Sequence, residues 1–233
     1  MANPVCAVVG IGPGNGAALA RRFAAAGYDL ALVSRSGELS GRLSRELKGA
    51  RAFECDAGDP ASITNTFAAI QSSIGAVDAL VYNAGSGTWG TVEEVTPEDF
   101  ERSWRVNALG LLATAQAVIP EMKRKGQGSI VVIGATASRR GGARAAAFAP
   151  AKAAQRSLAE SMARHLWPAG IHVSLIVIDG VVDLPRTRER LPGKPDEFFV
   201  KPDDVAATAL WLVRQPRSAW AFEVEARPFG ETW

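Results

Sequence analysis

Four glycines alternate with other residues near the start of the chain, at positions 10, 12, 14 and 16. An apolar run over 5–9 precedes them and predicts a buried strand, and residues 17–26 predict a helix. Glycines at such a junction let the backbone approach phosphate oxygens closely, and the helix N-terminus offers free N–H groups and partial positive charge. The pattern therefore predicts a pyrophosphate-binding loop, and the alternative is a structural turn in an ordinary strand–helix unit.

The second expected strand, residues 28–34, ends at Ser34 and Arg35. Dinucleotide-binding folds read the adenosine ribose about twenty residues beyond the glycines. An acidic side chain there accepts hydrogen bonds from a free 2′-hydroxyl, whereas the guanidinium of Arg35 can hold a 2′-phosphate. The sequence therefore favours NADP(H) over NAD(H), with a solvated loop arginine as the alternative.

The elements that must position these residues alternate along the chain. Strands are expected over 5–9, 28–34, 50–55, 77–82, 128–133, 171–178 and 219–226. Helices are expected over 17–26, 39–48, 60–74 and 150–166, with a long one from Pro97 that precedes Pro120 and a last one that begins at 201–204. Residues 185–195 predict a Pro/Arg-rich loop. Apolar strands that alternate with helices predict one α/β domain over 1–233, a doubly wound parallel sheet of about seven strands with helices on both faces.

Composition limits the function classes. A chain of 233 residues with 47% hydrophobic content suits one domain with a full core. The net charge of +2 and the scattered arginines argue against a nucleic-acid partner. His165 and His172 lie apart, so no metal site is expected, and Cys6 and Cys55 are expected as buried thiols. The chain begins with the first strand and has no apolar run long enough to span a bilayer, so we expect a cytoplasmic protein without membrane association.

In order and context, further residues resemble the short-chain dehydrogenase/reductase family over essentially the whole chain. The family's Gly-x-x-x-Gly-x-Gly matches Gly10, Gly14 and Gly16, and its Asn-Ala-Gly matches Asn83, Ala84 and Gly85. Three single residues also match: the Asp after the third strand is Asp56, the Asn of the fourth helix is Asn107, and the Lys of the catalytic helix is Lys152. The resemblance implies a Rossmann-type fold, a nicotinamide cofactor, a small-molecule substrate and a homodimer or homotetramer.

The resemblance also implies a set of cofactor-binding residues along the carboxyl ends of the strands. They are Gly10, Gly12, Gly14, Asn15, Gly16, Ser34, Arg35, Asp56, Asn83, Ala84, Gly85, Lys152, Gly180 and Val182. Of the family's catalytic residues, this chain retains Asn107 and Lys152.

Two catalytic positions depart from the family pattern. Phe148 stands where the family's Tyr-x-x-x-Lys has tyrosine, and Ala135 stands at the position of its serine. The two hydroxyls that bind and protonate a carbonyl are therefore missing. After the sixth strand, Asp179 replaces the proline of Pro-Gly, and Leu184 replaces a threonine near the carboxamide.

Phenylalanine cannot donate a proton, and positioned acid–base catalysis contributes about 10²–10⁴-fold. The candidate substitutes are the hydroxyls of Thr136 and Ser138, the carboxyl of Asp179 with a pKa raised by partial burial, and a water held between Asn107 and Lys152. The alternative for Asp179 is a hydrogen-bonded turn aspartate. Tyr82 is expected to pack into the fold.

Six arginines lie in the two loops that border the substrate pocket in this family: Arg139, Arg140, Arg144, Arg186, Arg188 and Arg190. They predict either a clamp for an acidic substrate or a solvated charged loop offset by nearby carboxylates. An aromatic tail (Trp220, Phe222, Phe229, Trp233) predicts core and subunit packing, with ligand contact as the alternative, and small helix residues (Ala151, Ala154) predict subunit packing.

Two functions stay open at this point. The first is an NADP-dependent oxidoreductase with an altered catalytic centre, which transfers hydride to a small-molecule substrate. The second is a catalytically silent NADP-binding module that senses redox state or regulates a partner.

Overall fold

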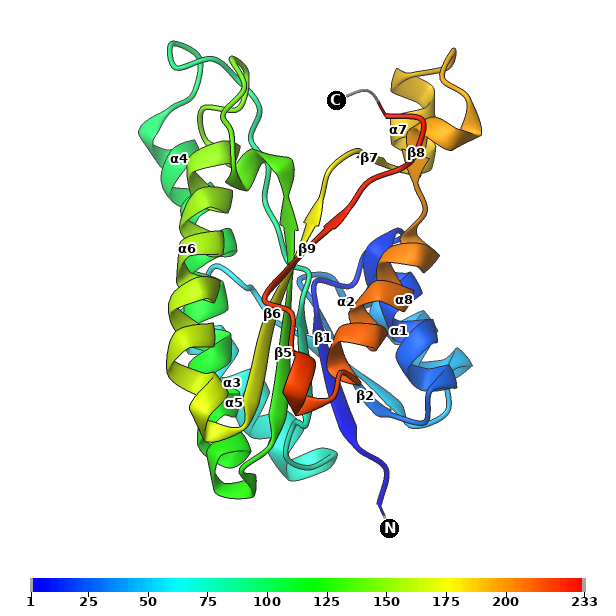
Figure 1. Cartoon of the computed structure of the whole chain (residues 1–233), viewed down its shortest axis with the longest axis vertical. Helices are drawn as coiled ribbons and strands as arrows, with labels where there is room; N and C mark the ends of the chain where they lie inside the picture. Colours follow the sequence, from blue (N-terminus) through cyan, green and yellow to red (C-terminus); the bar gives the residue numbers. More distant parts are fainter. Residues whose placement is uncertain (1, 232–233) are drawn as a thin grey trace.

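The computed structural model describes residues 2–231 and contains a seven-stranded parallel sheet of order β3-β2-β1-β4-β5-β6-β9 (Figure 1). The strands are β1 (Val5–Val9), β2 (Asp29–Ser34), β3 (Ala50–Glu54), β4 (Ala79–Tyr82), β5 (Gly128–Ala135), β6 (Ile171–Ile178) and β9 (Glu223–Ala226). A small second sheet pairs β7 (Val181–Val182) with β8 (Phe199–Val200). The predicted doubly wound α/β fold is confirmed.

Helices cover both faces of the sheet (Figure 1). One face carries α3 (Pro60–Ser73), α5 (Gly110–Lys125) and α6 (Phe148–Leu166), and the other carries α1 (Asn15–Ala25), α2 (Gly37–Glu46) and α8 (Pro202–Val213). Because side chains alternate along a strand, Val5, Ala7 and Val9 join one core and Cys6 and Val8 join the other. Each large apolar side chain buried in this way contributes about 1.5–3 kcal/mol.

The helix that begins at Pro97 is not regular. Thr96 caps α4 (Pro97–Trp104) by accepting from the Asp99 amide, as expected, but a π-helical turn over Arg105–Leu109 separates α4 from α5. The buried Tyr82 hydroxyl donates to the Val106 carbonyl at 2.5 Å, which diverts that carbonyl to a side chain. Helix α5 then continues through Pro120 to Lys125.

Two sequence-based boundaries are wrong. Residues 185–195 do not form one loop, because α7 spans Pro185–Arg190 with proline at its first position and Thr187 Oγ1 accepting from the Leu184 amide. The last strand begins only at Glu223, because a 3₁₀ turn and the stacking of Trp220 on His172 occupy the residues before it.

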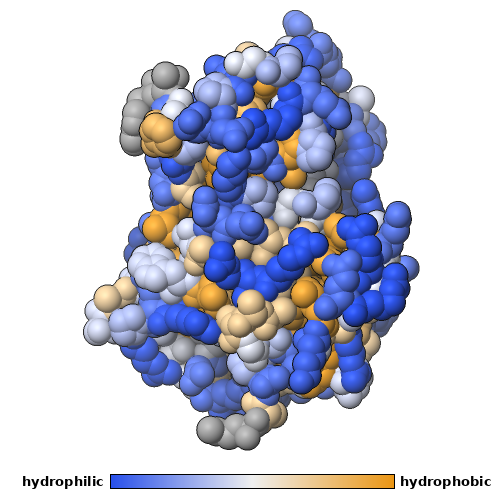
Figure 2. Space-filling model, turned by 90° about the vertical axis from the view of Figure 1, so that its right-hand side faces the viewer, coloured by the Kyte–Doolittle hydropathy of each residue, from blue (hydrophilic) through white to orange (hydrophobic). Residues whose placement is uncertain are grey.

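The side of the molecule that faces the viewer in Figure 2 is mainly hydrophilic, with apolar side chains scattered between charged ones. Within residues 2–231, no helix is both long and apolar enough to cross a membrane. Cys6 and Cys55 are both buried free thiols, as expected.

Gly10 stands at a position where the fold leaves no room for a side chain. Its φ is +99°, and a Cβ there would lie 2.4 Å from the Ala84 amide nitrogen. We predict that Gly10→Ala lowers the free energy of unfolding by about 1–3 kcal/mol through backbone strain and overpacking. Urea denaturation measures the loss.

Gly12→Ala is the matched control, because a Cβ at Gly12 meets no heavy atom of the described chain within 4 Å. Its free energy of unfolding should stay within about 1 kcal/mol of the wild type. Equal losses in the two variants would contradict the assignment of strain to Gly10.

Candidate active site

The carboxyl ends of the strands gather the predicted residues at one edge of the sheet. The strand order reverses between β1 and β4, and ligands of open α/β sheets bind in the crevice at such a switch point. Asn83, directly after β4, donates from Nδ2 to the Gly10 carbonyl at 2.7 Å, and its amide donates to Val9 at 2.8 Å. The loop after β1 and the end of β4 are therefore held together at the crevice.

The glycine loop has the features of a phosphate cradle. A Cβ at Gly16 would lie 2.5 Å from the Gly10 carbonyl oxygen, whereas the space beside Gly12 is open among the described residues. Helix α1 begins at Asn15 without a side-chain cap. The amides of Ala17 and Ala18 donate to the carbonyls of Gly12 and Gly14, which leaves the amides of Asn15 and Gly16 for an anion. The buried Oδ1 of Asn15 has no hydrogen-bond donor within residues 2–231, which leaves a position for a ligand hydroxyl. The loop fits a dinucleotide.

The segment after β6 covers part of this loop. A Cβ at Gly14 would lie 2.5 Å from the Leu184 side chain, which therefore rests on the glycine loop. Gly180 and Val182 lie in the same segment, and Val182 pairs with Val200 in the small sheet. The sequence alone gave no indication that Leu184 contacts Gly14.

At the adenosine end, Arg35 follows β2, is exposed, and forms no hydrogen bond or ion pair with another described residue. Ser34 is buried and hydrogen-bonded to Ser40, and Asp56 accepts from the Gly58 amide at 2.8 Å. A carboxylate that sequence reasoning missed, Glu54, lies against Gly37 at the start of α2.

The Lys152 amine is buried under the crevice. Nζ donates to the Ile133 carbonyl at 3.0 Å and to Gln155 Oε1 at 2.9 Å. Burial lowers the pKa of this amine to about 7, and no charged partner opposes the effect. Gln155 is fully buried and was not predicted as a site residue.

Asn107 reaches the same place from the π-helical turn. Its Nδ2 donates to the carbonyls of Ser86 and Ser103 at 2.9 and 2.8 Å. Its Oδ1 is buried without a donor among the residues described. A Cβ at Gly85 would lie 3.4 Å from Asn107 Oδ1 and 3.7 Å from Lys152 Nζ. The structure therefore brings Asn107, Lys152 and the Asn83–Gly85 segment together, as expected.

Phe148 and Ala135, which stand where the family has tyrosine and serine, make one side of the site apolar. The Phe148 ring centroid lies 5.9 Å from Lys152 Nζ and 5.0 Å from the ring of Trp89, which is 61% exposed. Ala135 ends β5 and adds only a methyl group. Neither position offers a hydroxyl to a substrate carbonyl.

Two of the proposed substitutes for the missing acid contact each other. The Thr136 hydroxyl donates to the Asp179 carboxylate and lies 3.2 Å from the Ile178 carbonyl. The same carboxylate pairs with Arg227 and has Arg140 at 3.7 Å. Asp179 therefore anchors the segment after β9 to the end of β6, as a hydrogen-bonded structural aspartate would.

Most loop arginines already have carboxylate partners in the chain. Arg139 pairs with Glu223 and Glu225, Arg144 with Glu94, and Arg188 with Asp183 and Asp196. Arg186 and Arg190 are exposed on α7. The pairs favour a charged loop over a clamp for an acidic substrate.

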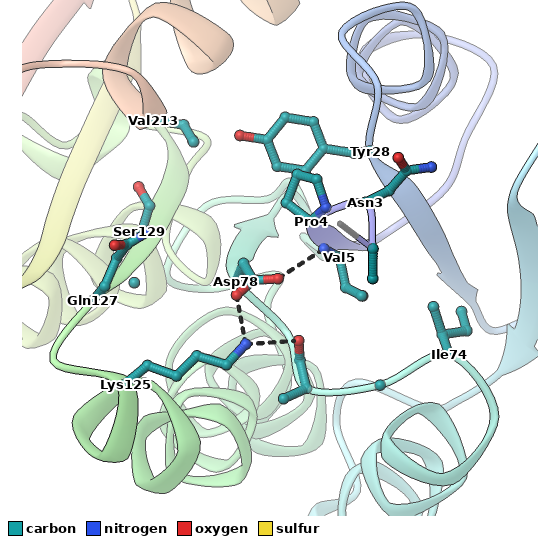
Figure 3. A pocket seen from close by; sticks show the side chains of 14 residues that line it. Asn3, Pro4, Val5, Tyr28, Ile74, Asp78, Lys125, Gln127, Ser129 and Val213 are labelled. Carbon is teal, nitrogen blue, oxygen red and sulfur yellow. Dashed lines mark hydrogen bonds and ion pairs between the residues drawn. The ribbon is translucent and has the colours of Figure 1, made fainter.

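A pocket of about 510 Å³ lies at the opposite edge of the sheet, among the amino ends of the strands (Figure 3). The carboxylate of Asp78 accepts from the Val5 amide and from Lys125 Nζ, at 2.9 and 2.6 Å. The charges that line it are therefore paired, and it is remote from Lys152. Within residues 2–231, no cluster of His, Cys, Asp or Glu could hold a metal ion.

Comparison with known proteins identifies the same architecture. The family model for short chain dehydrogenase matches residues 4–192. The 3-oxoacyl-[acyl-carrier-protein] reductase of Bos taurus is 30% identical over 218 residues, which cover 91% of this chain and 92% of that protein.

Solved structures agree over nearly the full length. A short-chain dehydrogenase from Rhodopseudomonas palustris has a TM-score of 0.84 at 32% identity and covers 98% of this chain and 100% of its own. A metagenomic short-chain oxidoreductase in complex with NADP has a TM-score of 0.85 at 26% identity, with 99% of each chain covered.

Proposed function

The chain belongs to the short-chain dehydrogenase/reductase family, and we propose that it is an NADP(H)-dependent oxidoreductase with an altered catalytic centre, acting on a small-molecule substrate. The observation that carries the proposal is the Lys152 amine held beside Asn107 and Gly85, next to an open glycine loop. Family members bind nicotinamide cofactors, and one structural relative is in complex with NADP.

The residues present fit this cofactor. The glycine loop and the free amides of α1 would hold the pyrophosphate, Arg35 the 2′-phosphate, and Asp56 the adenine. Lys152 would hold the nicotinamide ribose, with Asn83, Ala84 and Gly180 beside it. When bound, the nicotinamide supplies or accepts hydride. The chain has to position the substrate and donate or accept the proton of the reaction.

The altered wall changes what the site can do with a carbonyl. Phe148, packed against Trp89, offers an apolar surface beside the Lys152 amine. Without the two hydroxyls, an ordinary ketone bound there would receive neither a positioned hydrogen bond nor a tyrosine proton.

The missing hydroxyls also favour a second candidate, a catalytically silent NADP-binding module. Phe148 and Ala135 take away the two catalytic hydroxyls without disturbing the glycine loop, so the cofactor could bind without turnover. Stoichiometric oxidation of bound NADPH by a substrate supports the enzyme, and binding without any oxidation supports the module.

We also propose a homodimer or homotetramer in the cytoplasm, a reducing compartment that suits the two free thiols. Phe100 and Trp104 lie one turn apart on α4, Leu112 follows on α5, and each is at least 37% exposed. Two of the residues first considered for packing are less available, because Ala151 is buried and Trp220 stacks on His172 within the subunit, whereas Phe229 is exposed. Trp233 lies outside the described residues.

We predict that the protein binds NADPH more tightly than NADH. Loss of a charge-assisted contact costs about 1.5–3 kcal/mol, so Arg35→Ala should weaken NADPH binding about 10–100-fold and leave NADH nearly unchanged. The carboxylate of Glu54 lies against the start of α2, just after Arg35 in the chain. Glu54→Gln should strengthen NADPH binding, because it removes a negative charge that would repel the 2′-phosphate. Calorimetric titration of both cofactors measures these affinities.

Arg51→Ala on β3 is the matched control, since Arg51 is exposed but lies toward the amino end of its strand. It should leave both affinities unchanged. Equal wild-type affinities, or a preference that survives Arg35→Ala, would overturn the assignment of Arg35.

We predict little reduction of simple ketones and aldehydes by the wild type. The double change Ala135→Ser with Phe148→Tyr should raise NADPH oxidation about 10²-fold or more, because it restores a carbonyl donor and a proton source. Each single change should do less, since groups that act as a unit are non-additive. Unchanged NADPH affinity is the control, and robust wild-type turnover over a carbonyl panel would contradict the prediction.

We predict an assembly larger than the 24.6 kDa chain at micromolar concentration in sedimentation velocity. Trp104→Glu should shift the mass toward one chain, because it buries a charge in the exposed apolar side of α4 and α5. Phe229→Glu, at an exposed aromatic residue elsewhere, should leave the mass unchanged. A wild-type mass of one chain would refute oligomerisation, and dissociation by Phe229→Glu alone would move the interface to the tail.

A further inference from the structure

Gln155 follows Lys152 by three residues on α6, so the two side chains share one face of the helix. Gln155 is fully buried and uses both ends of its amide. Oε1 accepts from Lys152 Nζ at 2.9 Å, and Nε2 donates to the Asn107 carbonyl at 3.1 Å. One side chain therefore joins the amine to the π-helical turn that carries Asn107.

The Lys152 amine has two hydrogen-bond acceptors among the described residues, the Ile133 carbonyl and Gln155 Oε1. A neutral amine has two N–H donors and one lone pair, and the acceptors at Ile133 and Gln155 are two. An ammonium has a third proton, which these acceptors do not take. That third position is the one available to a ligand beside Gly85, whose Cβ would lie 3.7 Å from Nζ.

Charged groups on the surrounding elements are engaged elsewhere. In the part of the chain that is described, Arg105 contacts Gly58 and Glu101, and Arg102 pairs with Asp99. Arg156 pairs with Glu223, and Asp179 pairs with Arg227. Lys152 itself forms no ion pair with a described residue, and burial alone sets the direction of its pKa shift. The amide of Gln155 is thus its nearest polar side-chain partner.

We propose that Gln155 is a positioning residue that holds the Lys152 amine against Asn107 and makes it the proton-exchanging group beside Phe148. This inference rests on the proposed function, because that site lacks the tyrosine hydroxyl. The Nζ–H bond of the ammonium breaks, and the proton passes to a negatively charged substrate oxygen. Water from solvent then returns a proton to the neutral amine.

The test is the titration of Lys152 in the cofactor-free chain, which needs no substrate. The chain has six lysines, so selective ¹³Cε labelling gives few signals, and Lys152→Met assigns the one of interest. The wild-type midpoint should lie near pH 7, well below the ordinary lysine value. A midpoint near the ordinary lysine value would overturn the proposal.

Two substitutions of similar length probe Gln155. Gln155→Glu places a carboxylate on Nζ and should raise the Lys152 midpoint by at least about one pH unit. Gln155→Met removes both hydrogen bonds of the Gln155 amide and should lower the Lys152 midpoint. The ammonium loses more stabilisation than the neutral amine when the Oε1 acceptor is removed. An unchanged midpoint in both folded variants would show that Gln155 does not position the amine.

Thr114→Val on α5 is the control for a lost buried polar group, because the Thr114 hydroxyl has no hydrogen-bond partner within residues 2–231. It should leave the Lys152 midpoint unchanged, and a shift as large as that of Gln155→Glu would refute a specific effect. NADPH titration is run in parallel. A shifted midpoint without NADPH binding would uphold this inference and refute the proposed function, so the two failures are distinguishable.

Discussion

The close contact between the loop after β1 and the end of β4 is the constraint on which the rest of the structure depends. At Gly10 the two backbones approach so closely that a Cβ would lie 2.4 Å from the Ala84 amide nitrogen. The side-chain amide of Asn83 closes the same contact by donating to the Gly10 carbonyl. A Cβ at Gly16 would press on that carbonyl from the other side, so α1 is seated on the same point. The position of the crevice therefore follows from the packing of a few backbone atoms at the reversal of strand order.

The same strand end also organises the catalytic side of the site. Tyr82 and Asn83 are consecutive, so their side chains point to opposite faces of the sheet. Asn83 holds the glycine loop, while Tyr82 donates to Val106 in the π-helical turn that carries Asn107. Gly110 completes the contact, because a Cβ there would lie 2.4 Å from the Tyr82 hydroxyl. One strand terminus thus ties the glycine loop to the turn that carries Asn107, to whose carbonyl Gln155 donates.

The fold could be predicted because its signals are local. Apolar runs between glycines and helix starts mark the parallel strands, and residues 171–178 form β6 with the expected bounds. The glycine loop could be expected for the same reason, and Asn83, Asn107 and Lys152 could be expected at the site from the family resemblance. What the sequence could not provide are partners brought by packing. Glu54 reaches Gly37 through the pairing of β3 with β2, and the role of Gln155 depends on a carbonyl 48 residues away. The late start of β9 likewise depends on the stacking of Trp220 on the distant His172.

Ala135 and Phe148 do more than delete two hydroxyls. A tyrosine at 148 would place a polar group near the Lys152 amine, whereas the phenyl ring offers only an apolar face, with its centroid 5.9 Å from Nζ. Burial of the amine penalises the ammonium and lowers its pKa to about 7. A general acid works best when its pKa lies near the working pH, so burial brings the lysine into the useful range at a site that lacks the tyrosine acid. A buried amine without a carboxylate costs stability that an apolar side chain of similar volume would not, and such costly, perturbed groups concentrate at functional sites. The hydrogen bond that the Lys152 amine donates to Gln155 offsets part of that cost and fixes the direction of the amine. A lysine without a function would not require a fixed direction.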